Sequence, residues 1–249
     1  MSYPRNLFFA IVVVAAGGSG AALLVAPGST HRYFSWTLNP PAAAALIGGF
    51  YLASSAVFAW AITRPWRQAR ALLVGVLGLA VPTLVLSIVH ADVFDFGRWQ
   101  ALAWMGLFVT APVSATLLLV TGPPVEPGPQ AAVRVRALLA VLSAVLLAAA
   151  IVIWAGGEPL PMDLERLTGD YLGAWCTFLA LLCGFSALVG GRDEAEVALV
   201  TVAAASAGAA LGLLRMVGDI RRPALSLTVC VVVGVAAVVA ARTATSDGN

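Results

Sequence analysis

The chain has 249 residues, of which 61 % are hydrophobic and only 10 % are charged, and its formal net charge is +2. A soluble domain carries about 25 % charged residues, and a protein that binds nucleic acid presents a strongly basic surface. The composition excludes both classes and is typical of an integral membrane protein.

Eight long stretches contain no Asp, Glu, Lys or Arg. A helix needs roughly 20 apolar residues to cross a bilayer core, and in a helix the backbone polar groups are satisfied internally. We therefore predict an all-α polytopic transmembrane helix bundle of about eight spans. The connections are too short to fold alone, so residues 1–249 form a single membrane domain. The stretches cover residues 7–27, 42–62, 71–90, 99–121, 137–155, 171–190, 197–214 and 223–241.

The first stretch is longer than the apolar core of a secretory signal, so we expect a retained first helix. The loop that follows carries Tyr33, Phe34 and Trp36. Aromatic residues beside a span typically form a belt at the lipid headgroups, which is the first interpretation. The alternative is an amphipathic lid over a lipid-binding groove.

Small residues pervade the spans, for example at Gly48 and Gly49, and Pro82 and Pro112 lie within spans. Small residues allow close helix packing in a membrane, and proline predicts kinks. The alternative interpretation of these glycines and prolines is a hinge for alternating access.

The third stretch ends in a polar cluster that contains His90, Asp92 and Asp95. Histidine titrates near neutral pH and binds ligands and metals readily, but helix ends also collect polar residues. An interfacial cap, a ligand- or headgroup-binding site, and a catalytic or metal site all remain open. We assign no catalytic or metal-ligating residue.

A segment rich in proline and glycine, residues 121–130, divides the spans into two sets of four. Shifting the second set by 125 residues aligns Gly48 with Gly173, which suggests tandem four-helix units, 1–121 and 131–249. Two such units would share one orientation about an axis along the membrane normal. In this register Arg215 faces His90, with Asp219 four residues on. The ligand-binding candidates are therefore His90, Asp92, Asp95, Arg215 and Asp219.

The longest loop of the second half is acidic and is expected to be solvated; it carries Glu158, Asp163, Glu165 and Asp170. Arginine predominates in the loops on the side of the amino terminus, most clearly in the first half. By the positive-inside rule, we expect a multi-pass protein of the cell membrane with both termini in the cytoplasm.

The run Trp36-x-Leu-x-Pro40 is followed by Gly48-Gly-Phe-Tyr51. This pattern resembles a motif of uncharacterised bacterial multi-pass membrane proteins, in which a W-x-L-x-P segment leads into a helix containing glycine and aromatic residues. In those proteins a histidine often lies near the end of the next helix, as His90 does here. The resemblance covers the first half of the chain and implies no established activity.

No catalytic or nucleotide-binding motif occurs, and the span centres carry no charge. The leading prediction is a non-enzymatic membrane protein, structural or an accessory subunit. One alternative is a carrier for an apolar or lipid-like substrate, and another is an interfacial enzyme at the His90 cluster. The expected partners are membrane lipid and possible further subunits, with no cofactor and no nucleic acid.

Overall fold

The structure is a computed structural model that describes residues 2–126, 128–156, 162, 164–219 and 223–246. Within that part of the chain, eight helices are long and apolar enough to cross a membrane, which confirms the predicted fold class. A single turn, α2 (Thr30–Tyr33), lies between the first two. The long helices are α1 (Ser2–Val25), α3 (Pro41–Ala61), α4 (Trp66–Val89), α5 (Trp99–Thr121), α6 (Val133–Trp154), α7 (Arg166–Val189), α8 (Arg192–Arg215) and α9 (Pro223–Ser246).

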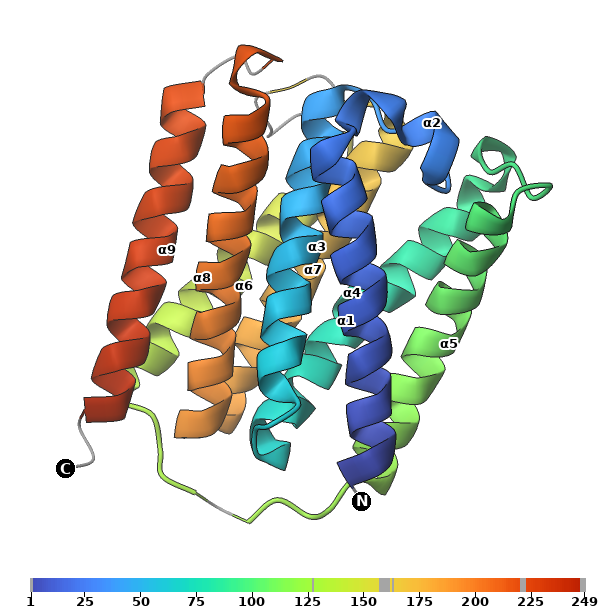
Figure 1. The fold of residues 1–249 in the computed structure, drawn as a ribbon. Coiled ribbons are helices and arrows are strands. Elements are labelled where there is room, and N and C mark those ends of the chain that lie inside the picture. Colours follow the sequence, from blue (N-terminus) through green and yellow to red (C-terminus); the bar gives the residue numbers. More distant parts are fainter. Residues whose placement is uncertain (1, 127, 157–161, 163, 220–222, 247–249) are drawn as a thin grey trace.

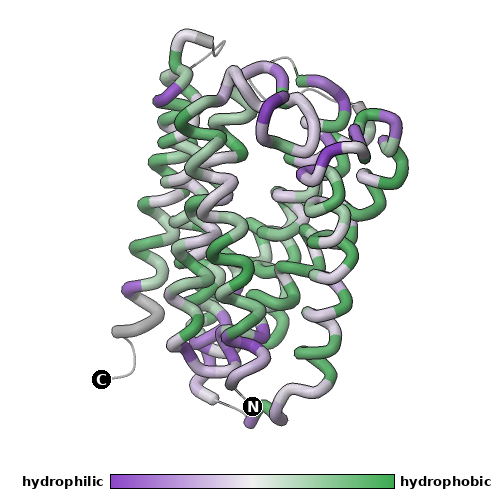
Figure 2. The backbone as a smooth tube through the Cα atoms, turned by 45° about the vertical axis from the view of Figure 1, so that its right-hand side comes forward, coloured by the Kyte–Doolittle hydropathy of each residue, from purple (hydrophilic) through white to green (hydrophobic). Residues whose placement is uncertain are grey.

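The long helices lie roughly side by side, and α1 begins at the same end of the bundle as α9 ends, the lower end in Figure 1. Apolar residues fill the middle of the bundle and polar residues gather at its two ends (Figure 2). This band is what a bilayer core requires of a spanning protein. The protein is therefore a multi-pass helical membrane protein.

Four helices, α3, α4, α7 and α8, form the interior, and α1, α5, α6 and α9 lie outside them. The interior helices pair across the two halves of the chain: α3 packs along α8, and α4 packs along α7. Each outer helix covers one interior helix, in the pairs α1 with α3, α5 with α4, α6 with α7 and α9 with α8. A duplicated four-helix unit would produce this pairing, and the duplication itself stays a prediction.

The backbones of α3 and α8 lie very close together where the two helices cross. A Cβ atom on Gly49 would collide with the backbone carbonyl of Gly208, and one on Gly208 would collide with that of Gly49. Only glycine allows the two backbones to come this near. Gly48 and Gly173, which the sequence register aligned, both face an outer helix: Gly48 contacts α1, and Gly173 contacts the Trp154 indole of α6.

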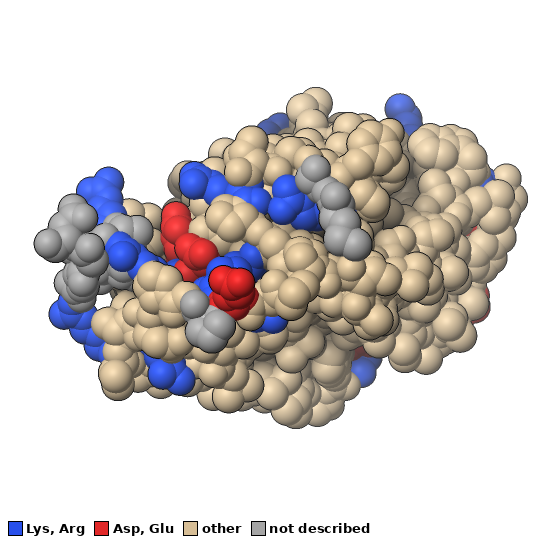
Figure 3. All heavy atoms as spheres, turned by 90° about the horizontal axis from the view of Figure 1, so that it is seen from below, with Lys and Arg blue, Asp and Glu red and all other residues tan. Residues whose placement is uncertain are grey.

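At the lower end, the segment between α5 and α6 is tied to the α7–α8 turn. The backbone N–H of Ala131 donates to the carbonyl of Gly190 at 2.8 Å, and that of Arg192 donates to the carbonyl of Pro129 at 2.9 Å. Gly190 ends α7 with a φ of 72°, the left-handed conformation that glycine adopts without strain. Figure 3 shows arginine side chains gathered around a smaller acidic patch on this face.

Candidate functional site

A cluster of aromatic rings fills the upper end of the bundle. The Trp36 ring lies at its centre, with ring centroids at 4.8 Å from Trp104 and 5.6 Å from Tyr171. Phe34 and Phe94 complete the cluster. Phe34 is 5 % and Trp36 is 3 % exposed, so the predicted headgroup belt is wrong for these two residues. The loop after α2 folds back over the bundle and buries them against α5 and α7.

Two hydrogen bonds fix the indoles of this cluster. The Trp104 indole donates to the Ser87 hydroxyl at 2.9 Å, and the Trp36 indole donates to the Thr168 hydroxyl at 3.4 Å. The hydroxyl of Tyr33, at the edge of the same loop, donates its hydrogen between two backbone carbonyls, that of Ala22 in the last turn of α1 and that of Ala26 directly after the helix. Partial burial raises the pKa of that hydroxyl, which therefore stays protonated and a donor.

His90 lies beside this cluster, directly after the last residue of α4. Its Nε2 atom is 3.5 Å from Oδ2 of Asp170 on α7, and Nε of Arg166 is 2.9 Å from the same oxygen. Asp170 is 3 % exposed, and its Oδ1 atom is buried with no hydrogen-bond partner. The sequence analysis predicted that Asp170 lies in a solvated loop; that prediction is wrong, because the residue lies inside α7 and its buried carboxylate faces His90 and Arg166.

Of the other predicted site residues with described side chains, Asp92, Asp95 and Arg215, none contacts His90. Asp92 and Asp95 are exposed, and Asp95 accepts a hydrogen bond from the backbone N–H of Gly97, which closes a turn. Arg215 ends α8 with an exposed side chain. Asp219 ends a short 3-10 turn, and its side chain lies outside the described part of the structure. The contact that His90 makes is with Asp170, from the opposite half of the chain.

The remaining acidic residues of the predicted loop differ in environment. Glu165 precedes α7 and accepts a hydrogen bond of 2.7 Å from the exposed Asn39 side chain. Glu158 and Asp163 lie outside the described residues. Of the described part of the loop, Glu165 keeps the solvated position that the sequence predicts, and Asp170 does not.

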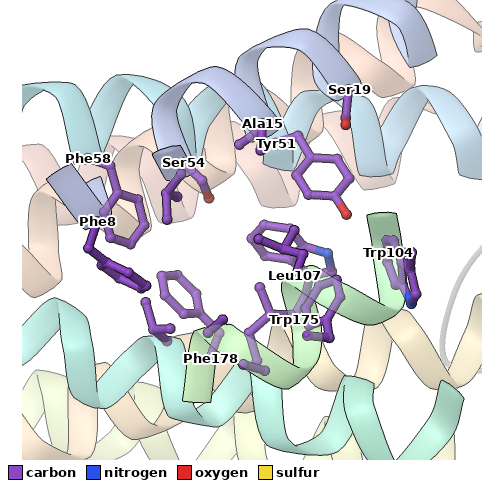
Figure 4. A pocket seen from close by; sticks show the side chains of 17 residues that line it. Phe8, Ala15, Ser19, Tyr51, Ser54, Phe58, Trp104, Leu107, Trp175 and Phe178 are labelled. Carbon is purple, nitrogen blue, oxygen red and sulfur yellow. The ribbon is translucent and has the colours of Figure 1, made fainter. Parts of the chain in front are cut away.

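Below the aromatic cluster lies a groove with a cavity of about 110 Å³. Its walls come from five helices, α1, α3, α4, α5 and α7, and Figure 4 shows their side chains turned into it. No charged side chain lines it. Phe8, Ala15 and Ser19 of α1 form one edge, and Leu107 and Ala111 of α5 form the other. The helices α1 and α5 make few contacts with each other, although each packs along an interior helix.

The upper end of the groove carries its polar atoms. The Tyr51 hydroxyl of α3 lies 2.6 Å from the Tyr171 hydroxyl of α7, and both side chains are buried. Figure 4 shows the hydroxyl of Tyr51 turned toward the indole of Trp175. The Trp175 side chain is 4 % exposed, and its indole nitrogen has no hydrogen-bond partner. The groove therefore ends in buried hydrogen-bond donors.

A second buried polar cluster lies at the lower end, between α4 and α8. Glu194 is completely buried, and its carboxylate faces two arginines, at 3.6 Å from Arg70 and 3.9 Å from Arg67. Both distances exceed a hydrogen bond, and neither carboxylate oxygen has another partner. The segment between α5 and α6, which we call the linker, covers this cluster, since Gly128 packs on the Arg67 guanidinium. The sequence analysis did not single out Glu194.

The residues of the groove could not be predicted from the sequence, because apolar and aromatic residues in a span are equally typical of ordinary helix packing. Tyr51 ends the run Gly48-Gly-Phe-Tyr51 noted in the sequence, but a single aromatic residue inside a span is typical of an ordinary helix core. In the described part of the chain, no group of three or more His, Cys, Asp or Glu side chains could hold a metal ion.

Comparison with known proteins gives no further guide to this groove. No protein-family model matches the chain, and no curated protein and no solved structure is significantly similar to it. The function is therefore argued from the geometry alone.

Proposed function

We propose that this membrane protein binds an apolar, lipid-like molecule in the groove between α1 and α5, as a carrier for such a substrate does. The observation that carries the proposal is the uncharged cavity of about 110 Å³ at the depth of the spans. An engineered apolar cavity of about 150 Å³ binds benzene, so a space of this size accommodates part of a hydrocarbon chain or ring.

The walls of the groove favour a ligand that enters from the bilayer. Because α1 and α5 barely touch, the side between them leads toward the hydrocarbon. The opposite walls, α3, α4 and α7, belong to the packed interior. Neither His90 nor Asp170 lines the groove, so their charges do not face its interior. The leading prediction from composition, a structural or accessory subunit, does not require such a groove.

The groove is tested by filling it. Ala15 lines the groove and Ala21 is exposed on the same helix. In vesicles of phosphatidylcholine with a diazirine in one acyl chain, we expect photolabelling to concentrate on the groove faces of α1 and α5. The Ala15→Phe variant should reduce this labelling severalfold, because the ring occupies the cavity, and Ala21→Phe should leave it unchanged. Mass spectrometry of the labelled peptides provides the measurement.

Uniform labelling of all lipid-facing helices, or equal labelling of the two variants, would contradict the proposal. A stoichiometric protein that co-purifies in mild detergent, together with an unlabelled groove, would favour the accessory subunit instead.

We further propose that the protein resides in the cell membrane with both termini in the cytoplasm, as the arginine distribution favours. Asp92 and Glu126 are exposed at opposite ends of the bundle. In a variant without the native cysteines, Asp92→Cys should react in intact cells with an impermeant thiol reagent, and Glu126→Cys should react only after lysis. The opposite pattern would reverse the orientation.

A further inference from the structure

The buried donors at the upper end of the groove outnumber their acceptors. Two hydroxyls 2.6 Å apart share one hydrogen bond, so whichever of Tyr51 and Tyr171 donates, the hydrogen of the other has no acceptor. The indole N–H of Trp175 also lacks an acceptor. A buried polar group without a partner destabilises the folded state, so native structures rarely leave one unpaired.

The neighbouring indoles show that this surplus is specific to Trp175. Among the buried or half-buried tryptophans of this region, the indole of Trp104 donates to Ser87, that of Trp36 to Thr168 and that of Trp154 to the Asp170 carbonyl. Trp175 lines the groove, as Trp104 does, but its N–H lies near the Tyr171 hydroxyl without making a hydrogen bond of good geometry. The unpaired donors therefore lie at one place, where the groove meets the tyrosine pair.

We infer that the ligand of this groove is an uncharged lipid-like molecule with an acceptor oxygen, of the ketone, ester or ether class, whose oxygen accepts from Trp175 and from the spare tyrosine hydroxyl. This inference rests on the proposed function and specifies its substrate class. The groove has no charged side chain to pair with an ionic headgroup, and burying an unpaired charge is costly. A pure hydrocarbon would leave both donors unsatisfied.

A water molecule satisfies these unpaired donors less well than a ligand oxygen does. The lower part of the groove is lined by Phe8, Phe58 and Phe178, and the space opens toward hydrocarbon. A water bound there needs two to four polar partners. The tyrosine pair and Trp175 supply mainly donors, whereas a carbonyl oxygen only accepts. The ligand oxygen therefore fits the surplus more closely than water does.

The test compares two probes of equal length, 2-pentadecanone and pentadecane, as competitors of the photolabelling described above. We expect the ketone to compete about three- to tenfold better than the alkane, which is the range for one net hydrogen bond. Trp175→Phe should reduce this preference, because the indole N–H is lost and only the tyrosine hydroxyl still donates, and it should keep alkane competition because an aromatic ring remains. The matched control is Trp154→Phe, which lies outside the groove lining and should keep the preference because its N–H already donates to the Asp170 carbonyl.

A second measurement does not depend on affinity. The infrared carbonyl band of ¹³C-labelled ketone bound to the protein should lie below that of the same ketone in lipid, and Trp175→Phe should reduce this shift. Equal competition by ketone and alkane, or loss of the preference in both tryptophan variants, would overturn the inference and leave the groove intact as an apolar site. Absence of groove labelling by any probe would instead contradict the proposed function itself. Thermal unfolding of each variant shows whether it folds.

Discussion

Replacing Gly49 by alanine is expected to prevent α3 from packing on α8. Among the glycine-to-alanine substitutions inside the helices of this protein, we expect this one to lower the free energy of unfolding the most. The added Cβ would meet the backbone carbonyl of Gly208, which cannot rotate away as a side chain can. Overpacking a core costs about 1–3 kcal/mol when side chains adjust, and two helix backbones must separate here. We expect a large fall in the unfolding temperature in detergent and a low yield of folded protein.

The control for this substitution is Gly18→Ala on α1, where a Cβ meets nothing within 4 Å. That substitution adds the same methyl group at an exposed helical position. In a helix interior, alanine is more stable than glycine by about 1 kcal/mol. The unfolding temperature of Gly18→Ala should therefore stay the same or rise. Equal unfolding temperatures for the two variants would show that α3 and α8 do not meet at Gly49.

Replacing Glu194 by glutamine is expected to lower the free energy of unfolding of the protein by weakening the packing at the lower end of the bundle. The substitution keeps the size of the side chain and removes the charge that faces Arg67 and Arg70. Removing one partner of a buried ion pair costs about 3–5 kcal/mol, because the remaining charge stays buried without compensation. The arginines are 17 % and 25 % exposed, so water relieves part of this cost and places the expected loss at the lower end of that range.

Unfolding of Glu194→Gln, Arg70→Gln and the double variant forms a thermodynamic cycle. The double variant should lose less stability than the two single losses added together. Glu126, an exposed carboxylate in the linker, provides the matched control, and Glu126→Gln should have little effect. Strict additivity of the two single changes would show that Glu194 and Arg70 do not interact.

The spans were predictable because hydropathy alone determines them. An uncharged run as long as residues 71–90 has few options in a membrane other than a helix, and α4 ends at Val89, directly before His90. The turn that follows is also local, since Asp95 accepts a hydrogen bond from the backbone N–H of Gly97 two residues on. Local chemistry is enough for these features, since helix ends and turns depend on neighbouring residues.

The site was much less predictable because its contacts join distant parts of the chain. Asp170 follows an acidic loop, and nothing beside it in the sequence signals that His90, 80 positions earlier, covers its carboxylate. Trp36 has the sequence context of a headgroup belt, and only its contacts with Trp104 and Tyr171 distinguish a buried ring from an interfacial one. Glu194 begins a helix, where a solvated acidic residue is the ordinary expectation.

The pairing of α3 with α8 and of α4 with α7 also constrains how the chain reaches its final arrangement during synthesis. The partner surface of α3 is complete only when α8 has been made, roughly 150 residues later, an interval of about 8–30 s at ordinary rates of translation. Throughout that interval the backbone exposed at Gly49 has no protein surface to meet. Lipid or the insertion machinery must cover it, so the first four helices wait in the membrane as an open assembly that the last four close.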